Sequence, residues 1–129
     1  MPLSEEELRQ RLTDLQSRDA VQCTQIAAFG VDLSQRRRLD LNFWTHDEAS
    51  AKKLAEALAR NAMPAGQALP PAGDPRRRWS VSCSLVASVD FITTRENVAT
   101  FLLFADKYGC EYDGWGTAVE EAAGPGPGA

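Results

Sequence analysis

The sequence predicts an α+β fold in which helices pack on an antiparallel sheet. Two patterns support this class: stretches whose hydrophobicity alternates with period two, typical of strands, and stretches whose apolar residues recur every three or four positions, typical of helices. They follow one another along 129 residues, of which 43% are hydrophobic and 25% charged. That length and composition are those of one soluble globular domain.

A helix is expected near the N-terminus, where Ser4 and Glu7 have the spacing of a capping box. The apolar residues that follow line one helical face at Leu8, Leu12 and Leu15. We predict a helix from Glu5 to Ser17. The next stretch, Val21 to Phe29, is richer in residues typical of strands, so residues 1–20 are expected to form a helical segment before the main domain.

The first clear strand and the second helix are neighbours in the sequence. From Arg38 to Trp44 apolar and polar residues alternate, which predicts a strand whose odd-numbered side chains face the core. From Glu48 to Arg60 the chain is rich in helix formers and carries an apolar stripe, which predicts a helix over that range.

A proline-rich connection precedes the segment with the clearest alternation. Gln67 to Leu69 is expected to form a short edge strand, followed by turns up to Pro75. From Trp79 to Leu85 apolar residues alternate with serines, which predicts a strand with one apolar and one hydroxyl face.

The last helix and strand complete the set of predicted elements. An apolar stripe predicts a helix from Arg95 to Tyr108, with Gly109 in a left-handed conformation at its end. Cys110 to Val119 is expected to form the final strand. The Gly-Pro repeats within residues 121–129 have nothing to bury, so this tail is expected to be disordered.

Over residues 21–120 the element order is therefore β-α-β-β-α-β, which predicts a ferredoxin-like α/β sandwich with an antiparallel sheet and an extra N-terminal helix. The two helices are expected to cover the sheet face that carries four apolar residues, Leu41, Phe43, Val81 and Cys83. The opposite face, with Asp40, Asn42 and three serines, is polar. It is expected to be either solvated or covered by the N-terminal helix.

Charge and composition exclude several classes of protein. A net charge of −4 gives no overall attraction to nucleic acid or to anionic membranes. No apolar stretch approaches the roughly 20 residues of a membrane span. Three widely separated cysteines predict neither a disulfide framework nor a zinc site. We therefore expect a cytoplasmic protein that holds no metal and no cofactor.

Residues 111–117 read Glu-Tyr-Asp-Gly-Trp-Gly-Thr and directly follow a predicted helix. This segment resembles the C-terminal signature of the regulator of ribonuclease activity B (RraB) family, and the likeness extends over about residues 38–119. The resemblance implies a small α/β sandwich that binds ribonuclease E and restrains RNA cleavage by protein contact, without catalysis. The Gly-Pro tail differs from the long acidic tail of the best-known members.

The same segment supplies the candidate partner-binding residues. On a regular strand Glu111, Asp113 and Trp115 would share one face, and tryptophan is enriched in the most important contacts of interfaces. The alternative is structural, with Trp115 packed over a bend or bulge that the flanking glycines permit. The sequence leaves both interpretations open. It predicts no catalytic residue, and His46, the only histidine, is expected to be an exposed turn residue.

Two arginine triplets are the candidate contacts for RNA or for an acidic partner: Arg36, Arg37 and Arg38, and Arg76, Arg77 and Arg78. Because the strands that they precede should be antiparallel, the triplets are expected at opposite ends of the sheet and not in one groove. RNA-recognition domains share the predicted element order, but they stack bases on aromatic strand residues where this chain has serines. Direct RNA binding, or an adaptor role with another partner, is therefore the alternative function.

Overall fold

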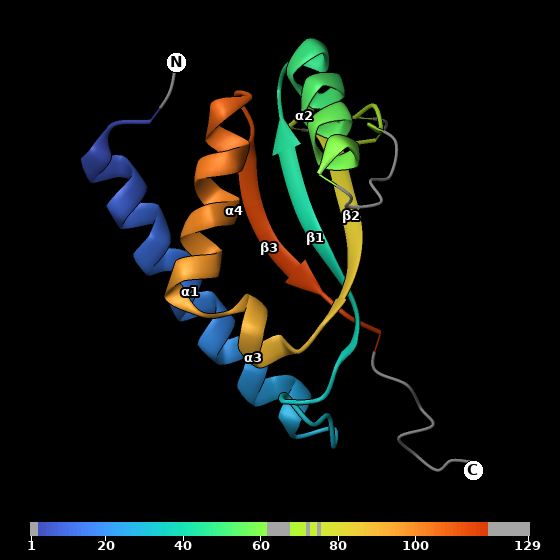
Figure 1. The fold of residues 1–129 in the computed structure, drawn as a ribbon. Coiled ribbons are helices and arrows are strands. Elements are labelled where there is room, and N and C mark those ends of the chain that lie inside the picture. Colours follow the sequence, from blue (N-terminus) through green and yellow to red (C-terminus); the bar gives the residue numbers. More distant parts are fainter. Residues whose placement is uncertain (1–2, 62–67, 72, 75, 119–129) are drawn as a thin grey trace.

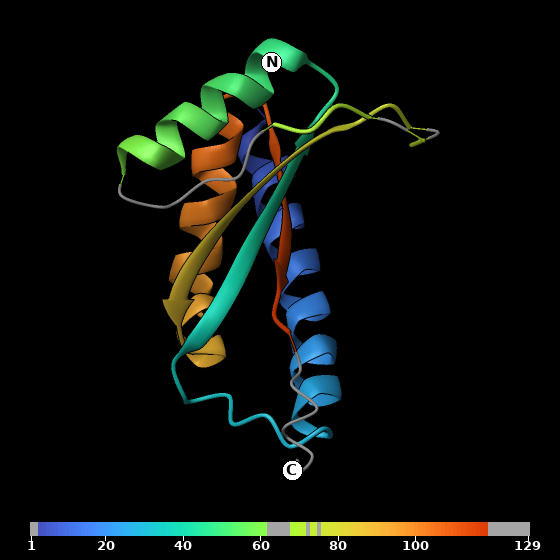
Figure 2. The same ribbon diagram turned by 90° about the vertical axis from the view of Figure 1, so that its right-hand side faces the viewer.

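The structure, a computed structural model, shows helices packed on one side of a three-stranded antiparallel sheet (Figures 1 and 2). It describes residues 3–61, 68–71, 73–74 and 76–118. In chain order the elements are α1 (Glu5–Ala27), β1 (Arg37–Thr45), α2 (Glu48–Arg60), β2 (Trp79–Ala87), α3 (Val89–Ile92), α4 (Arg95–Lys107) and β3 (Glu111–Gly116). The sheet order is β2-β1-β3. The predicted α+β class is confirmed.

The first strand, β1, forms the centre of the sheet, and its odd-numbered side chains from Leu39 to Thr45 are buried, as predicted. In the β1–β2 register Leu41 lies opposite Cys83 and Phe43 opposite Val81. All four of these side chains are buried where α2 and α4 pack on the sheet. The sequence therefore identified the covered face correctly, because period-two alternation fixes which side chains a strand buries.

The opposite face of the sheet is polar and carries no helix among the described residues (Figure 2). Asp40 and Asn42 of β1 are half-buried there, and the serines of β2 are exposed or half-buried. Of the two predicted states of this face, the solvated one is confirmed. The N-terminal helix α1 instead packs against α4 and β3.

The N-terminal helix is longer than predicted. Its capping box between Ser4 and Glu7 is present, but α1 continues past Ser17 to Ala27. The strand-like interpretation of Val21 to Phe29 is therefore wrong. The buried stripe of α1 runs on from the leucines through two further positions, Asp19 and Ile26. Because Asp19 is polar, the hydrophobicity pattern did not show that the stripe continues past Leu15.

The predicted short strand from Gln67 to Leu69 is reduced to one bridge. Leu69 exchanges two backbone hydrogen bonds with Ser80, at 2.8 and 3.0 Å, and belongs to no strand. Gln67 lies outside the described residues. The prolines that follow Leu69 in the sequence have no N–H to continue a ladder. The predicted sheet of four strands is therefore a sheet of three among the described residues.

The other helix boundaries agree closely with the sequence, whereas β3 is shorter than the predicted strand from Cys110 to Val119: it runs from Glu111 to Gly116, and Val119 lies outside the described residues. The predicted helix over 48–60 is α2 itself, α4 ends one residue before Tyr108, and Gly109 has the predicted positive φ of 76°. The short α3 was not predicted. It begins where the Ser88 hydroxyl accepts a hydrogen bond from the Phe91 N–H. The predicted tail, 121–129, lies outside the described residues.

Candidate protein-binding surface

A bulge in β3 sets the direction of every side chain in the segment 111–117. Tyr112 lies opposite Phe43 and Trp115 opposite Leu41, so three steps along β3 match two along β1. The extra residue is accommodated at Gly114, whose φ of 98° is costly for any residue with a side chain. Tyr112 and Trp115 consequently both point into the core.

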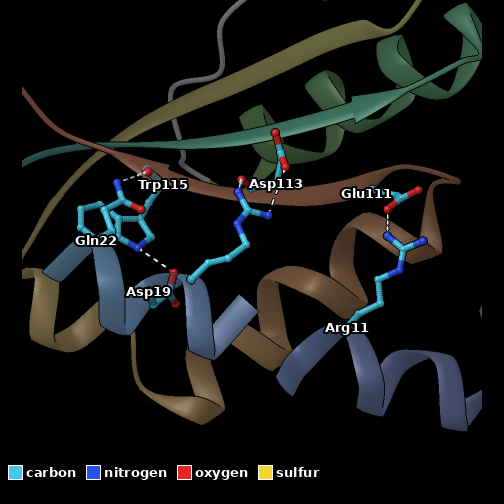
Figure 3. A network of polar contacts seen from close by, with 7 residues as sticks. Arg11, Asp19, Gln22, Glu111, Asp113 and Trp115 are labelled. Carbon is cyan, nitrogen blue, oxygen red and sulfur yellow. Dashed lines mark hydrogen bonds and ion pairs between the residues drawn. The ribbon is translucent and has the colours of Figure 1, made fainter. Parts of the chain in front are cut away.

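The predicted shared face of Glu111, Asp113 and Trp115 is therefore wrong, because strand alternation fails at a bulge. The Trp115 side chain is only 4% exposed. Its indole Nε1 donates a hydrogen bond of 3.0 Å to Oδ1 of Asp19 on α1 (Figure 3). In the described structure Trp115 ties β3 to α1 and presents almost no surface to a partner.

Asp19 is a carboxylic acid buried between α1 and β3, with 5% of its surface exposed. Burial raises the pKa of its carboxyl group above the ordinary value, although the Trp115 hydrogen bond and the Arg18 charge oppose that shift. Its second oxygen, Oδ2, and the hydroxyl of Tyr112 have no partner among the described residues. Burial also raises the pKa of the Tyr112 hydroxyl, so this tyrosine stays neutral.

Three polar side chains of α1, at positions 11, 18 and 22, run along the outer side of β3. Arg11 forms an ion pair with Glu111 (Figure 3). Arg18 lies 3.4 Å from the Asp113 carboxylate and donates a 3.0 Å hydrogen bond to the Asp113 carbonyl. Gln22 donates to the Trp115 carbonyl at 2.9 Å. Arg18 and Gln22 therefore donate to backbone carbonyls of β3, as the N–H groups of a neighbouring strand would, whereas Arg11 pairs only with a side chain.

The exposed part of this arrangement forms a charged surface, which we call the α1–β3 surface, made of Arg11, Arg18, Glu111 and Asp113. The carboxylate side chains of Glu111 and Asp113 are 27% and 46% exposed, and those of their arginine partners are more exposed. Surface ion pairs of this kind contribute about 0–1 kcal/mol each to stability. They can therefore be exchanged for charges of a partner at little cost to the fold.

Sequence reasoning identified the β3 half of this surface and missed the α1 half. Positions 11, 18 and 22 are spaced by seven and four residues, which places them on one helical stripe. That signal is present in the sequence, but it is visible only once α1 is extended beyond Ser17. Asp19 lies on the neighbouring buried stripe and was missed for the same reason.

The arginine triplets lie at opposite ends of the sheet, as predicted. Arg37 pairs with Ala87 at one end of the β1–β2 ladder, and Arg78 directly precedes Trp79, which pairs with Thr45 at the other end. Arg78 lies 3.0 Å from the Asp74 carboxylate, and its hydrogen bonds hold the pKa of Asp74 at about 2. Two separated ends do not form one groove for a nucleic acid.

Groups with potential for chemistry are dispersed over the described residues. His46 is exposed and packs edge-on against Trp44 with ring centroids 5.2 Å apart. All three cysteines are free, and burial raises the pKa of the Cys83 and Cys110 thiols to about 11. Within the described ranges, no three His, Cys, Asp or Glu residues gather as metal ligands, and no helix is long and apolar enough to cross a membrane.

A family model described as "Regulator of ribonuclease activity B" matches residues 16–117 of the chain. The matched range includes β3, its bulge and the second half of α1. The chain belongs to the RraB family. Comparison with curated proteins gave no match. The family-model match includes residues 111–117, so the resemblance stated for that segment is confirmed. Membership of this family implies a non-catalytic regulator of ribonuclease E activity.

Proposed function

We propose that this RraB protein binds ribonuclease E directly in the cytoplasm, inhibits RNA cleavage by that contact, and uses the α1–β3 surface to make it. The proposal depends on the outward-facing carboxylates of Glu111 and Asp113. The inward residues of the signature segment, Tyr112, Gly114 and Trp115, are explained by packing and by the bulge. The two carboxylates point outward and add little to stability, so recognition accounts for them better than folding does.

In this proposal Trp115 acts indirectly. It holds α1 against β3 through Asp19 and so sets the position of Arg18 beside Asp113. Glu111 and Asp113 make the contact, together with the α1 arginines. The chain would be a ferredoxin-like sandwich whose remaining strand is reduced to the Leu69 bridge, since the order β2-β1-β3 and the helix connections fit that topology.

The decisive experiment measures binding and inhibition with purified ribonuclease E from the same cell and a 5′-labelled RNA. The variant Glu111→Gln with Asp113→Asn should bind at least about tenfold more weakly and lose inhibition, because it removes two interface charges at constant shape. Glu48→Gln is the matched control, since Glu48 pairs with Lys52 at 2.7 Å on the surface of α2. Its binding should equal that of the parent chain.

Two results would contradict the proposal in different ways. A parent chain that neither binds ribonuclease E nor slows RNA cleavage removes the function itself. A double variant that binds and inhibits like the parent keeps the function and removes the α1–β3 surface as its site. Far-UV circular dichroism of each variant verifies that the fold is retained.

Direct RNA binding through the arginine triplets is tested by titrating single-stranded RNA at several salt concentrations. We expect no binding at about 50 mM salt, where phosphate contacts are strong, because the triplets are far apart and Arg78 is already paired. A steep salt dependence that disappears on changing Arg76, Arg77 and Arg78 to Ala would favour the RNA-binding alternative. Capture of a different protein from native lysate would favour an adaptor role.

A further inference from the structure

The outer edge of β2 offers backbone hydrogen-bonding groups to a further strand. Both the N–H and the C=O of Ser80 bond to Leu69, so they face away from β1. Because strand geometry repeats every two residues, the groups of Ser82, Ser84 and Val86 face the same edge. Among the described residues Leu69 is the only one whose backbone pairs with this edge.

The pairing of Leu69 with Ser80 indicates which part of the chain could extend along this edge. Leu69 runs antiparallel to Ser80, so the residues that would continue the pairing toward Val86 are those before Leu69. They include Pro64 and Gly66, which are both depleted in strands. Residues 68–71 lie beside only the start of β2 (Figure 2).

The edge also lacks the features that usually keep an open strand from pairing. Native edge strands are protected by charged side chains, prolines or bulges. The sequence of β2, Trp79–Ala87, contains no charged residue and no proline, and its pairing with β1 is regular from end to end. Such an edge is suited to β-augmentation, in which an extended peptide adds a strand to the sheet.

The side chains at the far end of β2 indicate the chemistry of that peptide. A shallow pocket there is lined by Arg36, Val86, Ala87, Ser88 and Phe91. Val86 and Phe91 are 58% and 57% exposed, and Arg36 is the only charged residue of the lining. The Arg36 guanidinium lies at the edge, where it donates a 3.3 Å hydrogen bond to the Val86 carbonyl.

A second arginine extends the positive charge along the edge. Arg38 donates to the Ser84 hydroxyl at 3.2 Å, and its side chain is 77% exposed. The nearby carboxylate of Asp40 accepts a 2.6 Å hydrogen bond from Ser84 and lies 4.0 Å from Arg38, so it neutralises part of that charge. Arg36 has no carboxylate partner among the described residues. The edge therefore complements an apolar and acidic peptide.

We propose that the outer edge of β2 binds an extended, acidic segment of the ribonuclease partner, which adds a strand to the sheet. One apolar side chain of the segment lies against Val86 and Phe91, and one carboxylate pairs with Arg36. This inference rests on the proposed function for the identity of the partner. It adds a second site at the edge of the sheet opposite the α1–β3 surface.

The test changes one backbone N–H. Ser82→Pro removes an outward-facing donor and leaves the ladder to β1 intact, whereas Ser82→Ala keeps the donor. The Ser82 side chain is exposed, and its hydroxyl makes no hydrogen bond within the described structure. Ser82→Pro should bind purified ribonuclease E at least about tenfold more weakly than the parent, and Ser82→Ala should match the parent. Val86→Asp, which puts a repelling charge in the pocket, should also weaken binding.

Amide hydrogen exchange locates the effect on the strand. In the free chain the amides of Ser82, Ser84 and Val86 should exchange faster than those of Val81, Cys83 and Leu85, which face β1. In the complex with ribonuclease E all six should be protected. This comparison uses the parent chain, so it holds even if Ser82→Pro does not fold.

Several outcomes would overturn the inference. Slow exchange at Ser82, Ser84 and Val86 in the free monomer would show that the chain covers its own edge. A dimer that Ser82→Pro dissociates would show that a second copy binds there. Unchanged affinity of Ser82→Pro and Val86→Asp, with the parent still bound, would remove this site and leave the proposed function standing. A parent chain that does not bind ribonuclease E removes both.

Discussion

Trp115 and Asp19 join the signature segment to α1, and their hydrogen bond is the most buried polar contact between the two elements. We expect Trp115→Phe to lower the free energy of unfolding by about 1–3 kcal/mol, because a buried acceptor then loses its donor. Urea denaturation at neutral pH measures this change. Trp79→Phe is the control, since Trp79 is half-buried and its indole N–H has no partner within the described structure. An equally small loss for both variants would contradict the anchoring role.

The raised pKa of Asp19 predicts a dependence of stability on pH. Below the ordinary value of 3.8 the carboxyl is protonated in both states, and as the pH rises the unfolded chain releases the proton first. The free energy of unfolding therefore falls as the pH rises from 3.8 through the folded pKa, and stays lowered above it. Arg18, Cys23 and Tyr112 are the ionisable groups that interact with this carboxyl.

Asp19→Asn removes that ionisation while its amide oxygen can still accept from Trp115. We expect the variant to gain stability relative to the parent as the pH increases, and the difference to level off above the folded pKa. Urea midpoints at closely spaced pH values measure the two profiles. Parallel profiles would mean that the Asp19 carboxylate is solvated in the folded protein.

The bulge of β3 depends on a backbone conformation at Gly114 that ordinary residues avoid. We expect Gly114→Ala to cost about 1–2 kcal/mol of stability, because the added Cβ is strained at positive φ. Space is not the cause, since the nearest atom to that Cβ would be Arg18 Nη2 at 3.6 Å. Gly116→Ala is the matched control on the same strand, where φ is not positive and no atom lies within 4 Å. Similar losses at both positions would contradict this account.

The elements that the sequence predicted well are those with a simple period. The spans of α2 and α4 and the alternation of β1 and β2 follow directly from where apolar residues recur. The second half of α1 was not predicted, because Asp19 interrupts the apolar stripe. The Trp115 hydrogen bond and the Arg18 charge, which compensate in part for the burial of Asp19, come from the folded structure. The prediction of which β3 side chains share a face was wrong for another reason. Glycines permit a bulge, but the register with β1 decides where the extra residue is placed.

The sequence also predicted only part of the candidate site. The residues of β3 were found because they belong to the signature segment. Glu111 and Asp113 still point outward in spite of the bulge. Arg11, Arg18 and Gln22 were not found, because their importance arises from a contact between elements about 100 residues apart in sequence. Such contacts depend on how α1 packs, and a local pattern carries no information about that packing.

The two edges of the sheet differ in what covers them. On the β3 side, α1 supplies side chains that bond to the backbone and ion pairs that face solvent. On the β2 side, one bridge at Leu69 is the only backbone pairing among the described residues. A partner that contacts both edges would hold the sheet from two sides, while the helices continue to cover its apolar face (Figure 1).

The three free cysteines test whether the molecule opens as one unit. Cys23 lies half-buried on α1, whereas Cys83 on β2 and Cys110 before β3 are buried, with thiol pKa values raised to about 11. In native buffer we expect a thiol reagent to modify Cys23 first. The two buried thiols should react slowly and at one common rate, because each is exposed only by global unfolding. Mass spectrometry of the time course measures the three rates. Fast modification of Cys110 with Cys83 still protected would show that β3 and α1 separate from the rest of the sheet on their own.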